Sequence, residues 1–146
     1  MQDSNSAATP LEDRRIPDPS PLRLLLVDDN GVNLKVAVRM LKRLGYHAET
    51  ASDGREAVNA VAASPYDIVL MDVHMPVLDG LEATAEIRKL DLAWQQPTIV
   101  AMTAAAMADD ERRCRVAGMD DYIPKPIKLR TLQETLERVT LGLDRT

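Results

Sequence analysis

The sequence has a single cysteine, no phenylalanine and only four aromatic residues, one tryptophan and three tyrosines. One cysteine excludes an internal disulfide and a multi-cysteine metal site, a composition typical of a reducing compartment, and we expect the protein to be cytoplasmic. With so few aromatic residues, a core has to be built from Leu, Val, Ile, Ala and Met. The 146 residues are enough for one domain and too few for two well-buried ones.

The chain also lacks an excess of basic residues and any long hydrophobic run. It has 18 Lys and Arg against 23 Asp and Glu, a net charge of −5, which argues against a nucleic-acid partner. No apolar run approaches the roughly 20 residues needed to cross a bilayer. The N-terminus lacks the charged-then-apolar pattern of a signal peptide. We therefore expect no direct contact with a membrane.

The first 21 residues are rich in proline and poor in apolar side chains. Such a segment buries too little surface to offset the entropy lost on ordering. We predict a flexible linker or tail at 1–21, one domain at 22–140 and a short C-terminal tail at 141–146.

Short apolar runs alternate with helical patterns after residue 21. Two of the runs end directly in aspartates, and all three are continuous, as is typical of strands buried on both faces. The predicted central strands are 24–27, 68–71 and 98–102. The alternating segment 47–51 and the short segment 122–123, which Pro124 follows, predict edge strands.

Five helices are predicted after these strands. Asn30 is a plausible N-cap of the first helix, which Gly45 ends, and Asp53 with Glu56 resembles a capping box. The later helices are predicted at about 81–89, 107–117 and 129–139. This alternation indicates an α/β fold, a doubly wound parallel sheet of five strands with helices on both faces. We match it to the flavodoxin-like strand order 2-1-3-4-5.

Polar residues follow the predicted strands at the edge where ligands bind in such sheets. They are Asp28, Asp29, Asp72, Thr103 and Lys125. Solvation alone could explain a polar residue at one strand end, and suffices for Thr103, but it does not easily explain three acidic residues after two apolar strands. Such carboxylates repel one another unless a cation or a shifted pKa relieves them.

The residue types at this edge indicate a specific chemistry. Hard oxygen ligands without a cluster of His or Cys suit Mg²⁺. A carboxylate can act as a nucleophile and form an aspartyl-phosphate. Lys125 would supply a fixed positive charge for phosphoryl oxygens, and Thr103 a hydroxyl donor. The sequence therefore predicts Mg²⁺-assisted phosphoryl transfer onto a carboxylate.

Four segments carry a resemblance to a known family. They read LLLVDDN (24–30), VLMDVHMPVLDG (69–80), VAMTA (100–104) and DDYIPKPI (120–127). With these four segments in this order, the chain resembles the CheY-like receiver domain of two-component response regulators, from Leu22 to about Thr140. The segments VDDNGVN and GMDDYIPKPI are most similar to those of receivers in hybrid histidine kinases and phosphorelays.

The resemblance implies a role for each acidic residue. Asp72 would accept the phosphoryl group. Asp28, Asp29 and Asp72 would hold Mg²⁺ together with the backbone carbonyl of His74. The implied partner is a sensor histidine kinase, a histidine phosphotransfer domain, or both.

The resemblance also implies a switch. Thr103 and Lys125 would contact the phosphoryl group, and Thr103 with Tyr122 would change conformation on phosphorylation. The bond between Lys125 and Pro126 would be cis. The face formed by residues 107–139 is a candidate surface for phosphorylation readout or for a homodimer. As this chain alone the protein would not be an independent enzyme, beyond adding and losing its own phosphoryl group, although a hybrid histidine kinase is a candidate parent protein.

Two alternatives from other classes remain open. A haloacid-dehalogenase-like phosphatase also uses an aspartyl nucleophile on a parallel sheet, but it needs a second acid two residues later, where this chain has His74. The other alternative is an interaction module that is never phosphorylated, against which the complete acidic set counts.

Overall fold

A single parallel sheet forms the centre of the structure, which is a computed structural model. The structure describes the backbone of residues 22–104 and 108–144 and the side chains of residues 22–104 and 111–142. Its strand order is β2-β1-β3-β4-β5, as predicted. The strands are β1 (Leu24–Val27), β2 (Ala48–Ala51), β3 (Ile68–Asp72), β4 (Thr98–Thr103) and β5 (Asp121–Pro124). The predicted linker at 1–21 lies outside the described residues, as do residues 105–107 and 145–146.

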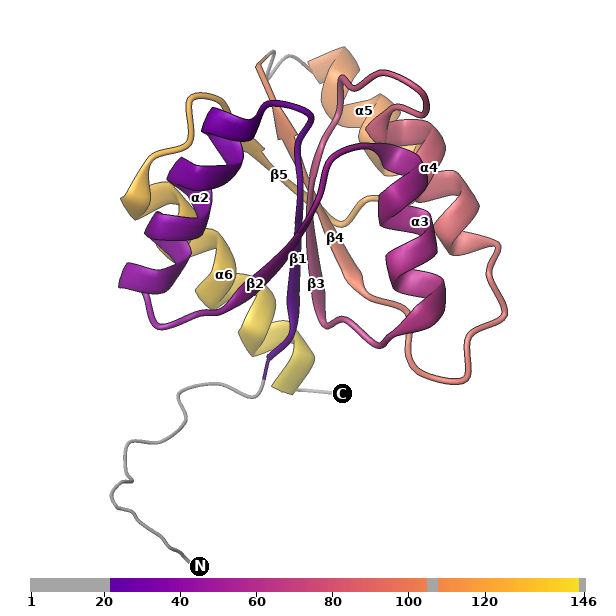
Figure 1. Ribbon diagram of the computed structural model, residues 1–146, viewed down its shortest axis with the longest axis horizontal. Helices are drawn as coiled ribbons and strands as arrows, with labels where there is room; N and C mark the ends of the chain where they lie inside the picture. Colours follow the sequence, from indigo (N-terminus) through magenta and orange to yellow (C-terminus); the bar gives the residue numbers. More distant parts are fainter. Residues whose placement is uncertain (1–21, 105–107, 145–146) are drawn as a thin grey trace, which may run out of the picture.

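Helices cover both faces of the sheet (Figure 1). They are α2 (Gly31–Arg43), α3 (Gly54–Ala63), α4 (Gly80–Arg88), α5 (Ala108–Ala117) and α6 (Leu129–Asp144). Helices α2 and α6 pack on one face, and α3, α4 and α5 pack on the other. In the described ranges, no helix is both long and apolar enough to span a membrane.

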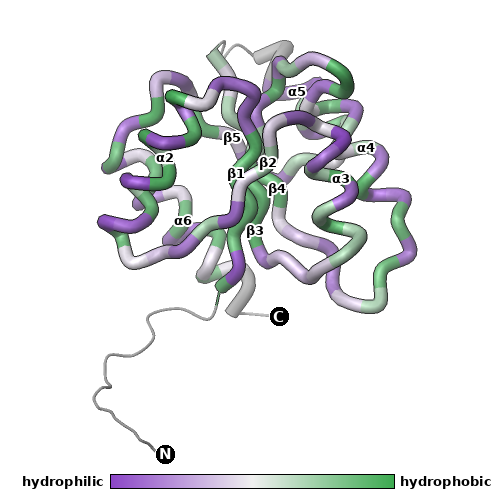
Figure 2. Tube along the Cα trace, viewed as in Figure 1, coloured by the Kyte–Doolittle hydropathy of each residue, from purple (hydrophilic) through white to green (hydrophobic). Residues whose placement is uncertain are grey.

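Each continuous apolar strand divides its side chains between two cores. In β1, Leu24 and Leu26 pack with α2 and α6, whereas Leu25 and Val27 pack with the helices of the opposite face. Successive side chains of a strand point to opposite faces, so a run without polar residues is the pattern that two covered faces require. Figure 2 shows the resulting concentration of hydrophobic residues along the central strands. Each buried Leu contributes about 1.5–3 kcal/mol relative to an exposed one.

The N-terminal cap of α3 differs in part from the prediction. The Asp53 side chain accepts a hydrogen bond from the Glu56 N–H at 2.8 Å, but the Glu56 carboxylate accepts from the Ser52 N–H instead of closing the box on Asp53. A complete capping box lies at the start of α4, where Asp79 and Glu82 bond each other's backbone N–H groups. In both helices, α3 and α4, a side chain therefore accepts a hydrogen bond from a backbone N–H group of the first turn.

The last helix ends later than predicted. Helix α6 continues through Asp144, so residues 141–144 are helical and do not form a tail after the helix. No proline interrupts this segment, and the single Gly142 costs only about 1 kcal/mol in helix propensity. The end predicted for this helix, at about 139, was therefore too early.

Candidate functional site

The two buried aspartates lie at the carboxyl ends of adjacent strands. Asp28 follows β1 and is 3% exposed, and Asp72 is the last residue of β3 and is 4% exposed. Strands β1 and β3 pair in parallel, with Val27 opposite Met71, which brings both aspartates to one edge. Two charged groups this deeply buried require nearby partners.

The partners of Asp28 hold both of its carboxylate oxygens. Its Oδ1 accepts a hydrogen bond from the Asn30 N–H at 2.9 Å. Its Oδ2 accepts from Lys125 Nζ at 3.2 Å. The backbone N–H of Asp28 donates to the carbonyl of Ala51 at 3.2 Å, which extends the pairing of β1 with β2. Asp28 is therefore fixed in position through both its backbone and its side chain.

The contacts of Asp72 are one-sided. Lys125 Nζ lies 3.1 Å from its Oδ1, and the His74 N–H donates to the same oxygen at 3.3 Å. Among the described residues, Oδ2 of Asp72 accepts no hydrogen bond. The close packing against the Asp72 backbone depends on Gly80, where a Cβ would meet the backbone carbonyl oxygen of Asp72 at 2.2 Å. Within the described residues, the contacts of the Asp72 carboxylate thus all go to Oδ1.

The three predicted carboxylates converge. Asp28, Asp29 and Asp72 each offer one oxygen, and these oxygens lie within 4.8 Å of one another. Asp29 is exposed, so the cluster opens to solvent on its side. Oxygen donors at this spacing with one exposed member fit Mg²⁺, which binds a few carboxylates and keeps several waters. The residues present therefore fit the metal that the sequence predicts.

Burial and charge shift the ionisation of Asp72 and Lys125. Burial raises the pKa of the Asp72 carboxyl above its ordinary value, the Lys125 ammonium opposes this, and the charge of Asp28 adds to it. Burial lowers the pKa of Lys125, but its hydrogen bond to Asp72 and the charges of Asp72 and Asp28 outweigh burial and raise that pKa overall. The ammonium therefore stays protonated at neutral pH and supplies a fixed positive charge.

The predicted switch residues lie on the neighbouring strands. Thr103 ends β4 and is 3% exposed, and its carbonyl accepts a hydrogen bond from the Lys125 N–H at 2.8 Å. Tyr122 lies on β5 and is half-buried against the core under α3, α4 and α5. The bond between Lys125 and Pro126 is cis, as the resemblance implies. His74 has an exposed side chain beside the site.

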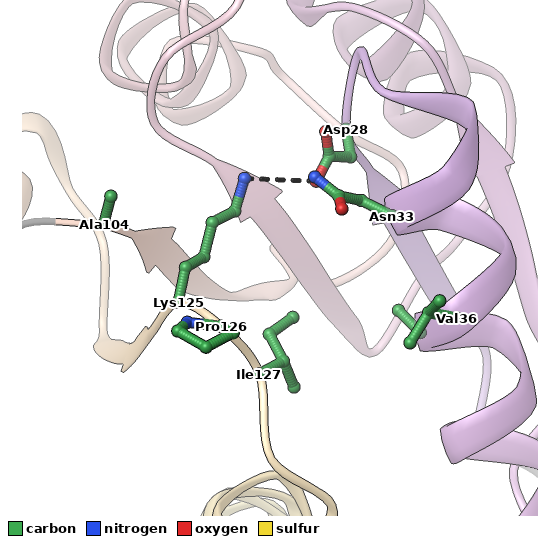
Figure 3. A pocket seen from close by; sticks show the side chains of 8 residues that line it. Asp28, Asn33, Val36, Ala104, Lys125, Pro126 and Ile127 are labelled. Carbon is green, nitrogen blue, oxygen red and sulfur yellow. Dashed lines mark hydrogen bonds and ion pairs between the residues drawn. The ribbon is translucent and has the colours of Figure 1, made fainter.

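An apolar groove of about 390 Å³ adjoins the acidic cluster (Figure 3). It lies between α2 and the segment after β5, and two of its lining residues, Lys125 and Asp28, form an ion pair at 3.2 Å. Its lining residues are Asp28, Asn33, Val36, Ala37, Ala104, Lys125, Pro126 and Ile127. The sequence did not predict four of these lining residues at the site: Asn33, Val36, Ala37 and Ile127. One signal in the sequence could have indicated a surface here. Val32 and Val36 are apolar but do not follow the spacing of the core-facing residues of α2, and they are 69% and 46% exposed.

Comparison with known proteins identifies the family. The family model described as the response regulator receiver domain matches residues 24–137. The chain belongs to the response regulator receiver family. This receiver domain is 37% identical over 146 residues to the sensor histidine kinase RcsC of Escherichia coli K12, an overlap that covers 97% of this chain and 15% of that protein. The receiver chain thus spans a small fraction of this curated relative.

Solved receiver structures agree with the fold. The receiver domain of the sensor histidine kinase PA1611 from Pseudomonas aeruginosa is 43% identical, with a TM-score of 0.73 over 82% of this chain and 97% of that one, and it holds a magnesium ion in its active site cleft. The receiver domain of Saccharomyces cerevisiae Ssk1, solved with the histidine phosphotransfer protein Ypd1, is 29% identical, with a TM-score of 0.73 over 78% of this chain and 85% of that one. The receiver family, not the haloacid-dehalogenase alternative, accounts for this chain.

Proposed function

We propose that this receiver domain takes a phosphoryl group from a phosphohistidine of a partner protein onto Asp72. The observation that carries the proposal is the position of this carboxylate. It is buried at the end of β3, 3.1 Å from the Lys125 ammonium, and it shares a cluster of oxygens with Asp28 and Asp29. A carboxylate nucleophile beside a fixed cation is suited to attack an anionic phosphoryl group.

The proposed transfer moves the phosphoryl group from an imidazole nitrogen of the partner to Asp72. An oxygen of the Asp72 carboxylate attacks phosphorus, and Oδ2 is the oxygen without a hydrogen bond among the described residues. A bond forms between this oxygen and phosphorus while the bond from phosphorus to the imidazole nitrogen breaks. The electron pair returns to the imidazole, which then takes a proton. Lys125 neutralises charge on the phosphoryl oxygens, and the Thr103 hydroxyl donates to one of them.

Magnesium belongs to the same proposal. Asp28, Asp29 and Asp72 would hold the ion with the backbone carbonyl of His74. When bound, Mg²⁺ supplies positive charge that offsets the repulsion between these carboxylates and the incoming phosphoryl group. The donor chemistry and the 4.8 Å clustering of the carboxylate oxygens support this assignment.

The proposed partner is a histidine phosphotransfer domain or a histidine kinase. The complex of the Ssk1 receiver with Ypd1 supports the first, and the histidine kinases among the relatives support the second. The apolar groove beside the site, with Val32 and Val36 exposed on α2, offers this partner a contact surface next to Asp72. The similarity to kinases that are several times longer also supports a hybrid histidine kinase as the parent protein.

Phosphorylation would be read out on the face of α5, β5 and α6. Movement of the Thr103 hydroxyl toward the phosphoryl group would change the packing around Tyr122 on the neighbouring strand. Helix α5 carries three exposed arginines and an exposed valine, Val116, and so offers a mixed surface for a partner or a second copy. Switches of this kind shift a population between two arrangements, with a typical coupling of about 1–3 kcal/mol.

Stoichiometric labelling tests this function against both alternatives. The full chain is incubated with phosphoramidate, a small donor with a phosphorus–nitrogen bond, with Mg²⁺ or with excess chelator, and its intact mass is measured. We expect one phosphoryl group per chain with Mg²⁺ and none with chelator. Steady hydrolysis of phosphate monoesters would favour a phosphatase instead, and a complete absence of labelling would favour an interaction module.

A further inference from the structure

The loop that follows Asp72 is held at two points by residues outside it. The Gly80 N–H donates to the carbonyl of Val73 at 2.8 Å and closes the base of the loop. The Gly54 N–H donates to the carbonyl of Leu78 at 3.1 Å. Gly54 is the first residue of α3, where a backbone N–H has no partner within the helix. The second contact therefore comes from an element distant in sequence.

Gly54 also gives this loop the space that it occupies. A Cβ added to Gly54 would lie 2.1 Å from the carbonyl oxygen of Leu78 and 2.9 Å from its carbonyl carbon. Both are backbone atoms, so they cannot move aside without moving the loop. The Leu78 side chain packs against the buried core, which limits such movement further. A side chain at position 54 is therefore incompatible with the observed loop.

The held segment is strained. Val77 has a φ of 70°, and the Leu78 N–H donates to the carbonyl of Pro76 at 2.7 Å, which describes a γ-turn centred on Val77. Turns of this hand are rare, and a β-branched residue at positive φ is an outlier. The Val77 side chain is 79% exposed, so its own packing does not compensate. Such strain persists where surrounding contacts over-determine the backbone, and the contact from Gly54 is one of these.

We propose that Gly54 is a positioning residue for the metal site, because it holds the loop that carries the His74 carbonyl. This inference rests on the proposed function, in which that carbonyl is a ligand of Mg²⁺. Gly54 is not one of the residues proposed to hold the metal or to contact the phosphoryl group. It acts through Leu78, and the closed base of the loop at Val73 and Gly80 transmits any displacement back toward His74.

A pair of glycine variants separates positioning from stability. Gly54→Ala is compared with Gly118→Ala, where the residue has a φ of 110° and a Cβ would meet the Arg88 side chain at 2.8 Å. Gly118 precedes β5 at the opposite end of the sheet, so its variant is destabilised without touching the loop. Mg²⁺ affinity is measured by calorimetry on the full chain, at a temperature where both variants are folded. We expect Gly54→Ala to bind at least about tenfold more weakly than wild type and Gly118→Ala to bind like wild type.

A second measurement needs no variant. If the contact from Gly54 favours Mg²⁺ binding, Mg²⁺ binding must favour the contact by the same factor. Hydrogen exchange of the Gly54 amide in the wild-type chain should therefore slow about tenfold at saturating Mg²⁺, more than exchange of the Gly118 amide, which donates to the carbonyl of Arg115. This test decides the matter if Gly54→Ala does not fold.

The outcomes are distinct. The positioning role is overturned if Gly54→Ala binds Mg²⁺ with the same affinity as wild type. It is also overturned if Mg²⁺ slows hydrogen exchange of the Gly54 amide no more than that of the Gly118 amide. Either result leaves the proposed function intact. A wild-type chain that binds no Mg²⁺ overturns the metal assignment itself and the positioning role with it.

Discussion

Lys125 Nζ lies 3.1 Å from Asp72 Oδ1, and the contact joins the segment after β5 to the end of β3. The same ammonium lies 3.2 Å from Asp28 Oδ2, so one cation is shared by two buried carboxylates. Without it their charges would repel each other in a poorly solvated environment. Lys125 therefore stabilises the acidic site before any phosphoryl group arrives, and the same charge would stabilise the phosphorylated state.

Replacing this cation should cost stability that Mg²⁺ partly restores. Lys125→Ala leaves two buried carboxylates without their counter-charge, and we expect the free energy of unfolding to fall by about 3 kcal/mol in the absence of divalent ions. Mg²⁺ should stabilise the variant more than the wild type, because it replaces the missing charge. Urea unfolding with and without Mg²⁺ measures both effects. Lys128→Ala, at an exposed position, is the control, and a Lys125 variant as stable as this control would contradict the account.

Thr103 should connect the site to α5. With the phosphoryl mimic beryllofluoride, wild type should show amide chemical shift changes along 108–117 by NMR. In Thr103→Ala these changes should be much smaller, because the variant lacks the hydroxyl that we propose contacts the phosphoryl group. Shifts near Asp72 itself should persist in both proteins, which shows that the mimic is bound. Full wild-type changes along α5 in the variant would show that Thr103 does not carry the signal.

The groove beside the site should matter for a protein donor and not for a small one. Val36→Asp places a charge on the exposed surface of α2, and we expect phosphotransfer from a phosphorylated partner protein to slow about tenfold, the effect of roughly 1.4 kcal/mol. Labelling by phosphoramidate should be unchanged. Ala62→Asp, at an exposed position of α3 on the opposite face of the sheet, is the matched control for added charge. Equal transfer rates for the two variants would place the docking surface elsewhere.

Tyr66 gives the fold a defined response to alkaline pH. The ring is 6% exposed, its hydroxyl donates to Glu49 Oε1, and the Arg23 guanidinium lies over it at 4.9 Å. Burial, together with the hydrogen bond and charge of Glu49, raises the pKa of Tyr66 from 10.0 to about 12. Because the neutral phenol is favoured in the folded state, this stabilisation is complete below pH 10 and is lost as the pH rises through about 12.

Comparison with Tyr66→Phe isolates this group from the other residues that titrate at high pH. Wild type should exceed the variant by about 1 kcal/mol in free energy of unfolding at neutral pH, because the variant lacks the hydrogen bond to Glu49. The difference should stay constant up to about pH 9 and shrink above pH 10. A difference that does not change up to pH 12 would show that burial does not oppose ionisation of this phenol.

Much of the fold could be predicted because its local signals are strong. Continuous apolar runs such as 24–27 have few solutions other than a strand covered on both faces, and Asn30 accepts hydrogen bonds from two N–H groups of the first turn, as an N-cap should. The polar residues at the strand ends could be placed together because parallel strands present their carboxyl ends at one edge. Pattern and topology together thus located the acidic cluster.

Features that depend on tertiary contacts could not be predicted in this way. The γ-turn at Val77 and the contact between Gly54 and Leu78 join two elements, and neither residue type signals the other. The same holds for Arg88, whose guanidinium donates to the carbonyls of Pro97 and Gly118 and to the side chain of Asp120. In the sequence it is one arginine in a helix. Such contacts become visible only when the helices and loops are placed.

The identity of the phosphoacceptor is tested most directly by intact-mass measurement of wild type and Asp72→Asn after treatment with phosphoramidate and Mg²⁺. The substitution keeps the shape of the side chain and removes the nucleophilic carboxylate. We predict that wild type gains the mass of one phosphoryl group and that Asp72→Asn gains none, while both proteins unfold cooperatively. Labelling of Asp72→Asn to the same extent as wild type would contradict the central claim, because another residue would then be the acceptor.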